Sequence, residues 1–423
     1  MYVPLRFGVP VILSTVLVFA GAGPAAAERP GEAVRGWGDQ GSVVLFENPP
    51  SAPSAVGTVD EVVDLDVTPR GRPLASAWTN ARGGFQATFK EYAKNGEPAT
   101  WRFGKKGVSG LFSGLLWYFD TTIRDPVKVA NDGRIWLNDG RNVYRLTDRG
   151  AADASFTNSW GGSVPGRAGG YLEGSDEMAL LPDGSVARTG QYGDADWVYE
   201  QHSSSGAQAV HVRWDLFDRC HLGQVGLCAP GTSDSAPAPA GARVWLSSLG
   251  AWRFAADLEL DTTFGDDGTV VEPGVALAEL ESTADGYVIS GSRGGSTVLF
   301  AITADGRRDP AFGKAAETTI PRGNPEVLRV RPNGSLVVAG NDPASGPWVA
   351  SVLGNGRLDR AFNRTGILDA VPGGVLGAGP NETRTHLFSA ELFEGDLLVG
   401  LSAVKYGIPN GSVRMTRLEL GWS

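Results

Sequence analysis

The stretch Ala301-Ile-Thr-Ala-Asp-Gly-Arg-Arg-Asp-Pro-Ala-Phe-Gly313 recurs in related copies along this chain of 423 residues. Each copy joins an Asp-Gly or Asn-Gly turn to an Asp-x-x-Phe segment, and a short apolar stretch follows. The Asp-x-x-Phe copies are Asp153–Phe156, Asp261–Phe264, Asp309–Phe312 and Asp359–Phe362. Self-similarity at a fixed period indicates a repeat architecture, so this pattern outranks every local motif as evidence for the fold.

The Asp and the Phe recur in every good copy, which favours a structural role for both. We expect Asp309 and Asp359 to bind turn amides through their carboxylates, and Phe312 and Phe362 to fill the space between adjacent units. A calcium site would need several oxygen ligands converging in one loop, and one Asp per turn does not supply them.

A second landmark is a glycine between two short extended segments, as in Val330-Arg-Pro-Asn-Gly-Ser-Leu-Val-Val338. Asp-Gly and Asn-Gly pairs supply the positive φ that a two-residue hairpin turn needs. Seven positions fit: Gly71, Gly133, Gly184, Gly241, Gly286, Gly334 and Gly395. Subtracting neighbouring positions gives spacings of 62, 51, 57, 45, 48 and 61 residues, which is room for about four short strands each. The sequence therefore predicts seven units.

The two ends of the chain look like parts of one unit. Trp37-Gly-Asp-Gln-Gly41 has the form of a Phe-Gly-x-x-Gly unit end, and Val43–Phe46 follows as a leftover strand. Residues 385–420 contain three strands and stop before the motif. Pairing the two would close a ring and remove exposed sheet edges. We expect an all-β, seven-bladed β-propeller of four-stranded antiparallel blades.

The units at 301–313 and 352–362 resemble the delta-60 repeat, a bacterial repeat of about this length that ends in Leu-Asp-x-x-Phe-Gly and is predicted to form β-propellers. The resemblance is clear from about 253 to 368 and weaker elsewhere. It implies the architecture alone, because such repeats carry no shared catalytic residue to transfer. The Gly-Gly and Trp-Asp signatures of the kelch and WD-type propellers are absent at the matching positions.

The first 27 residues have the features of a secretory signal. Arg6 precedes an apolar run from Val9 to Ala20, and the small residues Ala25-Ala-Ala27 follow. We expect cleavage near Ala27 and a secreted, extracellular mature chain, because the apolar run is short for a membrane anchor. Residues 28–423 are expected to form one propeller domain with an expanded loop at about 200–240.

Composition and missing motifs exclude several function classes. The net charge is -10 and no basic run is present, which disfavours nucleic acid and anionic membrane surfaces as partners. The sequence contains neither a P-loop nor a Gly-x-Ser-x-Gly nucleophile elbow. A carboxylate pair for glycoside chemistry stays open, because loops distant in sequence can build it.

The expanded segment holds both cysteines and three of the four histidines. In an exported chain, Cys220 and Cys228 are expected to form a disulfide. His202, His211 and His221 are weak candidates for a zinc or general-base site, since their spacing matches no compact motif; the competing interpretation is that they are polar surface residues. We expect no metal and no cofactor.

In a propeller, the loops between second and third strands share one face with the inter-blade connections, around the channel mouth. The ligand-binding candidates on that face are Trp78, Asn138, Asp139, Arg141, Tyr192, Asp194, Arg293, Asn341, Asp342 and Lys405. Aromatic rings beside Asn, Asp and Arg suit a sugar or a peptide.

These features predict a monomeric, secreted binding or scaffolding module for an extracellular glycan or protein. The alternative is a propeller-type polysaccharide hydrolase or lyase with a carboxylate and His site in the channel mouth. Converging acidic or His residues there would favour the enzyme, and a shallow aromatic and polar surface the binding module.

Overall fold

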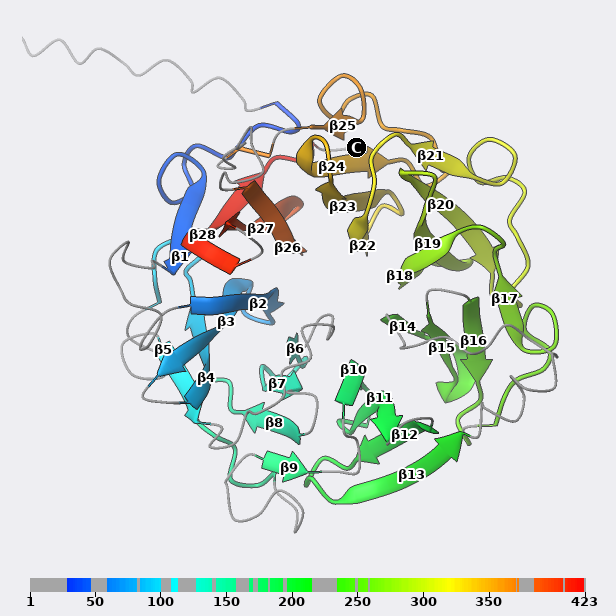
Figure 1. The fold of residues 1–423 in the computed structure, drawn as a ribbon, viewed down its shortest axis with the longest axis horizontal. Helices are drawn as coiled ribbons and strands as arrows, with labels where there is room; N and C mark the ends of the chain where they lie inside the picture. The colour runs from blue at the N-terminus through cyan, green and yellow to red at the C-terminus, as the bar shows by residue number, and fades with distance from the viewer. Residues whose placement is uncertain are drawn as a thin grey trace, which may run out of the picture.

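The computed structural model describes residues 29–46, 59–81, 84–99, 108–112, 127–138, 142–156, 167–169, 174–181, 183–192, 196–214, 234–247, 250–257, 259–369, 371–372, 384–405 and 408–421. They form seven four-stranded antiparallel sheets, arranged as blades around a central channel (Figure 1). The expected seven-bladed β-propeller is confirmed. No helix in these ranges is long and apolar enough to cross a membrane.

We number the blades along the chain and call their strands A to D from the axis outward (Figure 1). Blade 1 contains β2 (Val59–Thr68), β3 (Arg72–Ala81), β4 (Gly84–Glu91) and β5 (Val108–Phe112). Blade 2 contains β6 (Val127–Val129), β7 (Ile135–Asn138), β8 (Asn142–Leu146) and β9 (Arg167–Gly169). Blade 3 contains β10 (Gly174–Leu180), β11 (Val186–Tyr192), β12 (Asp196–His202) and β13 (Gln208–Trp214).

Blade 4 contains β14 (Asp234–Pro237), the short 3-10 turn η1 (Pro239–Gly241), β15 (Arg243–Leu246), β16 (Gly250–Phe254) and β17 (Thr269–Val271). Blade 5 contains β18 (Ala276–Ser282), β19 (Gly286–Arg293), β20 (Ser296–Thr303) and β21 (Thr318–Ile320). Blade 6 contains β22 (Pro325–Val330), β23 (Leu336–Asp342), β24 (Gly346–Val352) and β25 (Ile367–Leu368). Blade 7 contains β26 (Arg384–Phe393), β27 (Asp396–Lys405), β28 (Ile408–Leu418) and β1 (Ser42–Phe46).

Six of the seven landmark glycines lie between strand A and strand B of a blade, and Gly286 is the first residue of its strand B. Each has a positive φ, from 63° at Gly71 to 157° at Gly286. A side chain is strained in this region of backbone space, so glycine is the residue that such a turn selects. Their use as markers of seven units is therefore confirmed.

The apolar core is divided into layers between blades. Each of seven clusters of buried residues in the described part of the chain combines side chains from two consecutive blades, and one of them joins blade 7 to blade 1. The motif aromatics Phe156, Phe264, Phe312 and Phe362 belong to these layers and are at most 2% exposed. Because each blade buries both faces on its neighbours, no blade is stable in isolation.

The motif carboxylates hold their own turns. Oδ1 of Asp309 accepts the amide of Ala311 at 2.9 Å, and Oδ1 of Asp359 accepts the amide of Ala361 at 3.0 Å. Asp153 and Asp261 do the same with the amides two residues ahead. The expected structural role of the motif is confirmed.

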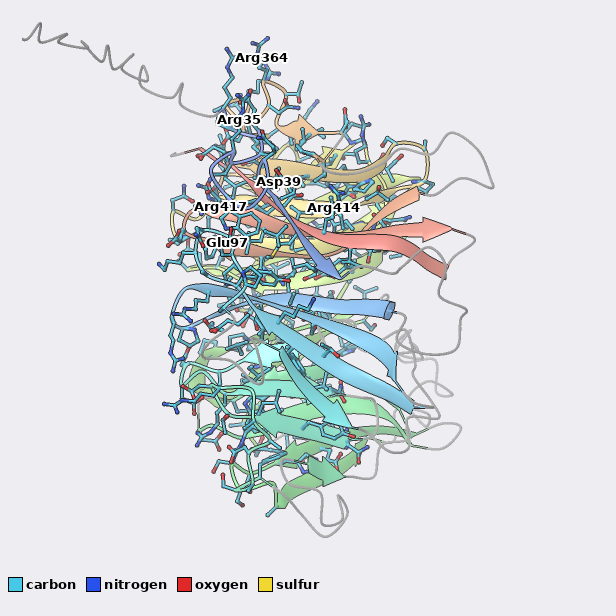
Figure 2. The ribbon with its side chains drawn as sticks, turned by 90° about the vertical axis from the view of Figure 1, so that its left-hand side faces the viewer. Arg35, Asp39, Glu97, Arg364, Arg414 and Arg417 are labelled. Carbon is cyan, nitrogen blue, oxygen red and sulfur yellow. The ribbon has the colours of Figure 1, made fainter. Side chains whose placement is uncertain are left out.

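The N-terminal strand closes the ring. β1 pairs with β28, so that Ser42 lies opposite Thr416. Trp37, which is 1% exposed, takes the place of the motif Phe in the layer between blades 7 and 1. The amide of Val34 also donates to the carbonyl of Arg417 at 3.0 Å, and Figure 2 shows Arg35, Asp39 and Arg417 together at this seam.

Blade 3 departs from the repeat. The turn at 203–207 joins β12 directly to β13, and the Asp-x-x-Phe segment is absent. β13 has seven residues, whereas β9, β17 and β21 each have three. Part of the segment that we expected to be an expanded loop is therefore an outer strand. Residues 215–233 lie outside the described part of the chain.

Candidate functional site in the central channel

The inner strands enclose a cavity of about 400 Å³ on the channel axis. Its walls come from β2, β6, β14, β18, β22 and β26, which are the A strands of six blades. In β2, β18, β22 and β26 the lining residues lie in the later part of the strand, as Asp66 and Glu281 do, so the cavity is displaced towards the A–B turns. This end is opposite the face where the sequence placed a ligand.

Charged side chains dominate the cavity wall. Its five carboxylates and two cationic groups are Asp64, Asp66, Asp234, Glu281 and Glu391, with Lys128 and Arg329. The wall therefore has three more acidic groups than basic ones. No aromatic side chain is among the described residues of the wall. The site is therefore a polar pocket, unlike the aromatic and polar surface that we expected at the other mouth.

Several of these carboxylates bind the blade next to their own. Oδ2 of Asp66 on β2 accepts the amide of Val129 at 2.7 Å, and Oδ2 of Asp234 on β14 accepts the amide of Leu280 at 2.6 Å. Oδ1 of Asp64 accepts the hydroxyl of Ser389 at 2.7 Å. These bonds hold the inner strands in register and fix the carboxylates in place.

Arg329 links two acids from the blades on either side of it. Its Nε donates to Oε2 of Glu391 at 2.9 Å, and its Nη1 lies 3.6 Å from Oε1 of Glu281. Acidic side chains of the wall therefore neutralise the guanidinium, so it attracts an anionic ligand only weakly.

Burial and neighbouring charges raise the pKa of two acidic side chains in the wall. Burial in the channel, together with the neighbouring charge of Glu391, raises the pKa of Asp66 to about 7. Burial and the charges of Asp234 and Glu391 raise the pKa of Glu281 to about 8, against the opposing effect of Arg329. Both carboxyl groups therefore titrate near neutral pH, because ionising them adds negative charge to a confined acidic site.

The acids do not converge on one point. Across the described ranges, no group of three or more His, Cys, Asp or Glu side chains is arranged to hold a metal ion. The charges are instead spread around the ring, with one or two from each of six blades.

The candidates predicted from sequence lie at the far ends of the B strands. Asn138, Asn341 with Asp342, and Arg293 end β7, β23 and β19, and Trp78, Tyr192 and Lys405 lie in or at the end of β3, β11 and β27. The side chains of these last three are outside what the structure describes, as are Asp139, Arg141 and Asp194 altogether.

The described candidates make contacts within the scaffold. Asn138 is fully buried. The amide group of Asn341 donates to the carbonyl of Leu387 at 2.7 Å and its oxygen accepts the amide of Leu387 at 2.8 Å, which ties blade 6 to blade 7. Asp342 accepts the amides of Ala344 and Gly323, each at 2.9 Å, and Arg293 forms an ion pair with Glu317. These side chains therefore hold the strands and turns at this end of the blades in place.

A second polar cluster lies inside blade 3. Arg188 and Glu200 form an ion pair with no exposed surface, and Nε2 of His202 is 3.5 Å from Oε2 of Glu200. His202 is completely buried, so its interpretation as a polar surface residue is wrong. On the neighbouring strand His211 lies opposite Glu200, although its side chain is not described. His221, Cys220 and Cys228 lie outside the described residues.

Sequence reasoning missed the channel charges although a signal was present. Asp66, Lys128, Glu281 and Arg329 each precede a landmark glycine by five residues, and Glu391 precedes Gly395 by four. Aligning the units on their turn glycines would have shown a charged position in an otherwise apolar strand.

Comparisons with known proteins assign this chain to no family. No protein-family model matches the sequence, and a search of curated proteins returned no match. Among solved structures, apo AztD from Citrobacter koseri is 10% identical, with a TM-score of 0.41 over 90% of this chain and 96% of that one. A protein of unknown function from Bacteroides caccae is 12% identical, with a TM-score of 0.39 over 73% and 98%. The PQQ-bound aldose sugar dehydrogenase from Streptomyces coelicolor is 10% identical, with a TM-score of 0.37 over 70% and 91%.

Proposed function

We propose that this chain is an exported binding module, and that its ligand, an extracellular glycan or protein, places a polar group in the central channel. The observation that carries the proposal is the charged cavity of about 400 Å³ on the axis. This volume is within the range of ligand pockets. The carboxylates are held by bonds between blades, so a ligand would meet a site that is already organised.

The proposal also includes the cellular setting. We infer export from the apolar run and small residues that end at Ala27, and a delta-60-type repeat from the units at 301–313 and 352–362. In an oxidising compartment Cys220 and Cys228 would form a disulfide. The N-terminal strand β1 completes blade 7 within a single chain, which favours a monomer.

A hydrolase or lyase is the second candidate, because acidic residues do gather in the channel. Glu281 and Glu391 lie on either side of Arg329, and the pKa of Glu281, raised to about 8 by burial, would keep a proton at neutral pH. A protonated acid together with a second acidic side chain is the pairing that glycoside cleavage uses. Against it, no aromatic platform for a sugar lies among the described residues of the cavity wall.

Binding of the purified chain to a glycan array and to peptidoglycan tests the proposal. Three proteins are compared: the natural chain, Glu391→Gln in the channel wall, and Glu259→Gln at an exposed turn of blade 4. Binding that is lost only with Glu391→Gln supports a channel ligand. Equal binding by both variants would show that the ligand binds outside the channel. Release of soluble sugar from a bound polymer would establish the enzyme.

A further inference from the structure

One rim of the ring carries exposed cations that no other side chain neutralises. Among the side chains that the structure describes, six lysines and arginines make neither an ion pair nor a hydrogen bond. Five of the six lie in the outer turns of blades 5 and 6 and in the N-terminal segment: Lys314, Arg357, Arg360, Arg364 and Arg29. They come from three separate segments, so no basic run in the sequence indicates them.

Contacts between these segments bring the cations into one row. The amide of Gly313 donates to the carbonyl of Asn355 at 2.8 Å. The amide of Asn363 donates to the carbonyl of Pro30 at 3.2 Å. Each of these four residues lies one or two positions from one of the cations. The row therefore follows the turns of blades 5 and 6 and ends at the seam, and Figure 2 shows Arg364 at the edge of the molecule there.

Few carboxylates accompany the row. Glu32 is the one exposed carboxylate within residues 29–32, 311–316 and 353–366, and its Oε2 accepts a backbone amide. Asp359 is buried and holds its own turn. The row is therefore positively charged, although the chain as a whole has a net charge of -10.

Equivalent positions in blade 4 show that the fold does not require these cations. Two residues after the motif Phe, blade 6 has Arg364 where blade 4 has Asp266. One residue after the motif Asp, blade 6 has Arg360 where blade 4 has Thr262. Because blade 4 forms the same four strands with a neutral and an acidic residue there, folding does not account for the two arginines.

Blade 6 also lacks the acid that neutralises the same turn in blade 5. In blade 5, Oδ2 of Asp305 lies 3.3 Å from Nε of Arg307. The equivalent residues of blade 6 are Asn355 and Arg357. An amide group carries no charge, so the guanidinium of Arg357 is not neutralised.

A buried cation lies behind the seam end of the row. Arg331 is 8% exposed and pairs with no carboxylate of the described residues. Its Nη2 donates to the carbonyl of Gly421 at 2.8 Å, and its Nη1 has no hydrogen-bond partner. Gly421 lies against Pro30, next to Arg29. A buried charge without a counterion is unfavourable, and an anion bound at this end of the row would reduce that cost.

We propose that this row binds a linear acidic polysaccharide, whose carboxylate or sulfate groups pair with successive cations. Guanidinium groups bind such oxyanions through two parallel hydrogen bonds. A row of separate charges fits an extended chain that carries an acid on several of its sugar units. This surface is separate from the channel, and it shares only the exported setting with the proposed function.

A nucleic acid fits the row less well. A DNA duplex is a stiff rod with one charge per about 1.7 Å, so it would bring phosphates against the rest of an acidic chain. A flexible polysaccharide can follow the row alone.

Surface plasmon resonance with immobilised polymers provides the test. The probes are polygalacturonate, dextran sulfate, uncharged dextran and a DNA duplex. We expect the natural chain to bind at least one of the two acidic polysaccharides and not dextran, with an affinity that falls as salt is added. The acid that is bound more tightly identifies the charged group.

Matched variants then assign the surface. Arg360→Gln with Arg364→Gln removes two charges from the row, and Arg70→Gln with Arg149→Gln removes two from exposed turns of blades 1 and 2. The row variant should bind the acidic polysaccharide about tenfold more weakly at low salt, because each exposed charge pair contributes about threefold. The control variant has the same net charge and should bind like the natural chain. Arg360→Lys with Arg364→Lys should recover most of the affinity, and thermal unfolding checks that each variant is folded.

The outcomes separate this proposal from the channel ligand. Equal losses in the row and control variants, equal binding of dextran, tighter binding of DNA, or binding of no polymer would each overturn the row. Glu391→Gln in the channel should leave binding of the acidic polysaccharide unchanged. Loss with Glu391→Gln but not with the row variant would overturn the row and support the channel.

Discussion

The amide of Gly265 donates a hydrogen bond to the carbonyl of Asp305 in the next blade, at 2.8 Å. The same bond joins Gly313 to Asn355 and Gly38 to Asn95. In each case the Gly of one blade's Phe-Gly pair, or of Trp37-Gly38 at the seam, touches the third turn of the following blade. The repeated motif is thus a connector between units at these three seams.

This contact predicts an unequal response to two glycine substitutions. Gly306 and Gly334 have φ values of 84° and 81°, so alanine is strained by about 1–2 kcal/mol at both. At Gly306 an added Cβ would also lie 2.5 Å from the amide nitrogen of Gly265, whereas nothing lies within 4 Å at Gly334. Gly306→Ala should therefore cost roughly 1–3 kcal/mol more than Gly334→Ala. Denaturant unfolding measures the difference, and equal losses would contradict the role of the connector.

A second substitution should stabilise the protein. The loops that follow the motif aromatics place Gly41, Gly268 and Gly366, each four residues after its aromatic, at φ values between 86° and 90°. Blade 5 has Ala316 at this position, at 63°. Ala316→Gly relieves the left-handed strain and adds freedom to the unfolded chain, for a net gain of about 0.5–1 kcal/mol. Ala311→Gly nearby should instead cost about 0.4–1 kcal/mol, since Ala311 is not at positive φ. Chemical denaturation of the two variants would reveal the opposite signs.

The sequence predicted the repeat, the blade count and the closure because these depend on local chemistry. Turn glycines need positive φ, motif carboxylates bind amides two residues away, and apolar aromatics fill the layers. Each signal lies within a few residues, so one chain reveals it by repetition.

The channel site could not be predicted in the same way. Asp66 and Glu391 are 325 positions apart, and only ring closure brings their blades together. Arg329 likewise contacts Glu281 and Glu391 from two different blades. The prediction of a site at the other mouth relied on polar loop residues, and Asn341 and Asp342 show that such residues also hold neighbouring strands and turns.

The buried ion pair of blade 3 predicts a contrast between single and combined substitutions. Arg188 pairs with Glu200 at the register where blade 5 has Ile289 and Phe300, and His202 corresponds to Ile302. Arg188→Ile alone leaves a carboxylate buried without its cation and should cost about 3–5 kcal/mol. Arg188→Ile with Glu200→Phe and His202→Ile restores an apolar pair, so stability should return to the natural level or exceed it by about 1–4 kcal/mol. Denaturant unfolding of both variants measures this, and a triple variant as unstable as the single one would show that the cluster is needed for packing.

The same cluster should also affect how the stability of the protein falls at low pH. Although burial opposes ionisation, Arg188 and the adjacent His202 hold the pKa of Glu200 at about 2, below its ordinary value of 4.5. A carboxyl group with a lowered folded-state pKa stabilises the protein above its unfolded value, and this contribution is lost as the pH falls from about 4.5 to about 2. The triple variant lacks the group, so its stability should decline less over that window.

Glu281 predicts the opposite dependence, at higher pH. Burial and the charges of Asp234 and Glu391 raise its folded-state pKa from 4.5 to about 8, so the folded protein holds the proton more tightly than the unfolded chain does. Below about pH 4.5 both states are protonated and the group contributes no pH dependence; as the pH rises towards 8 it lowers the free energy of unfolding. Glu281→Gln stays neutral throughout. The variant should match the natural protein near pH 4 and exceed it at pH 9, with Glu259→Gln unchanged relative to the natural chain at both. Thermal unfolding across that range measures the difference, and a variant less stable than the natural protein at pH 9 would mean that the ionised Glu281 and Arg329 together stabilise the channel more than the confinement of charge destabilises it.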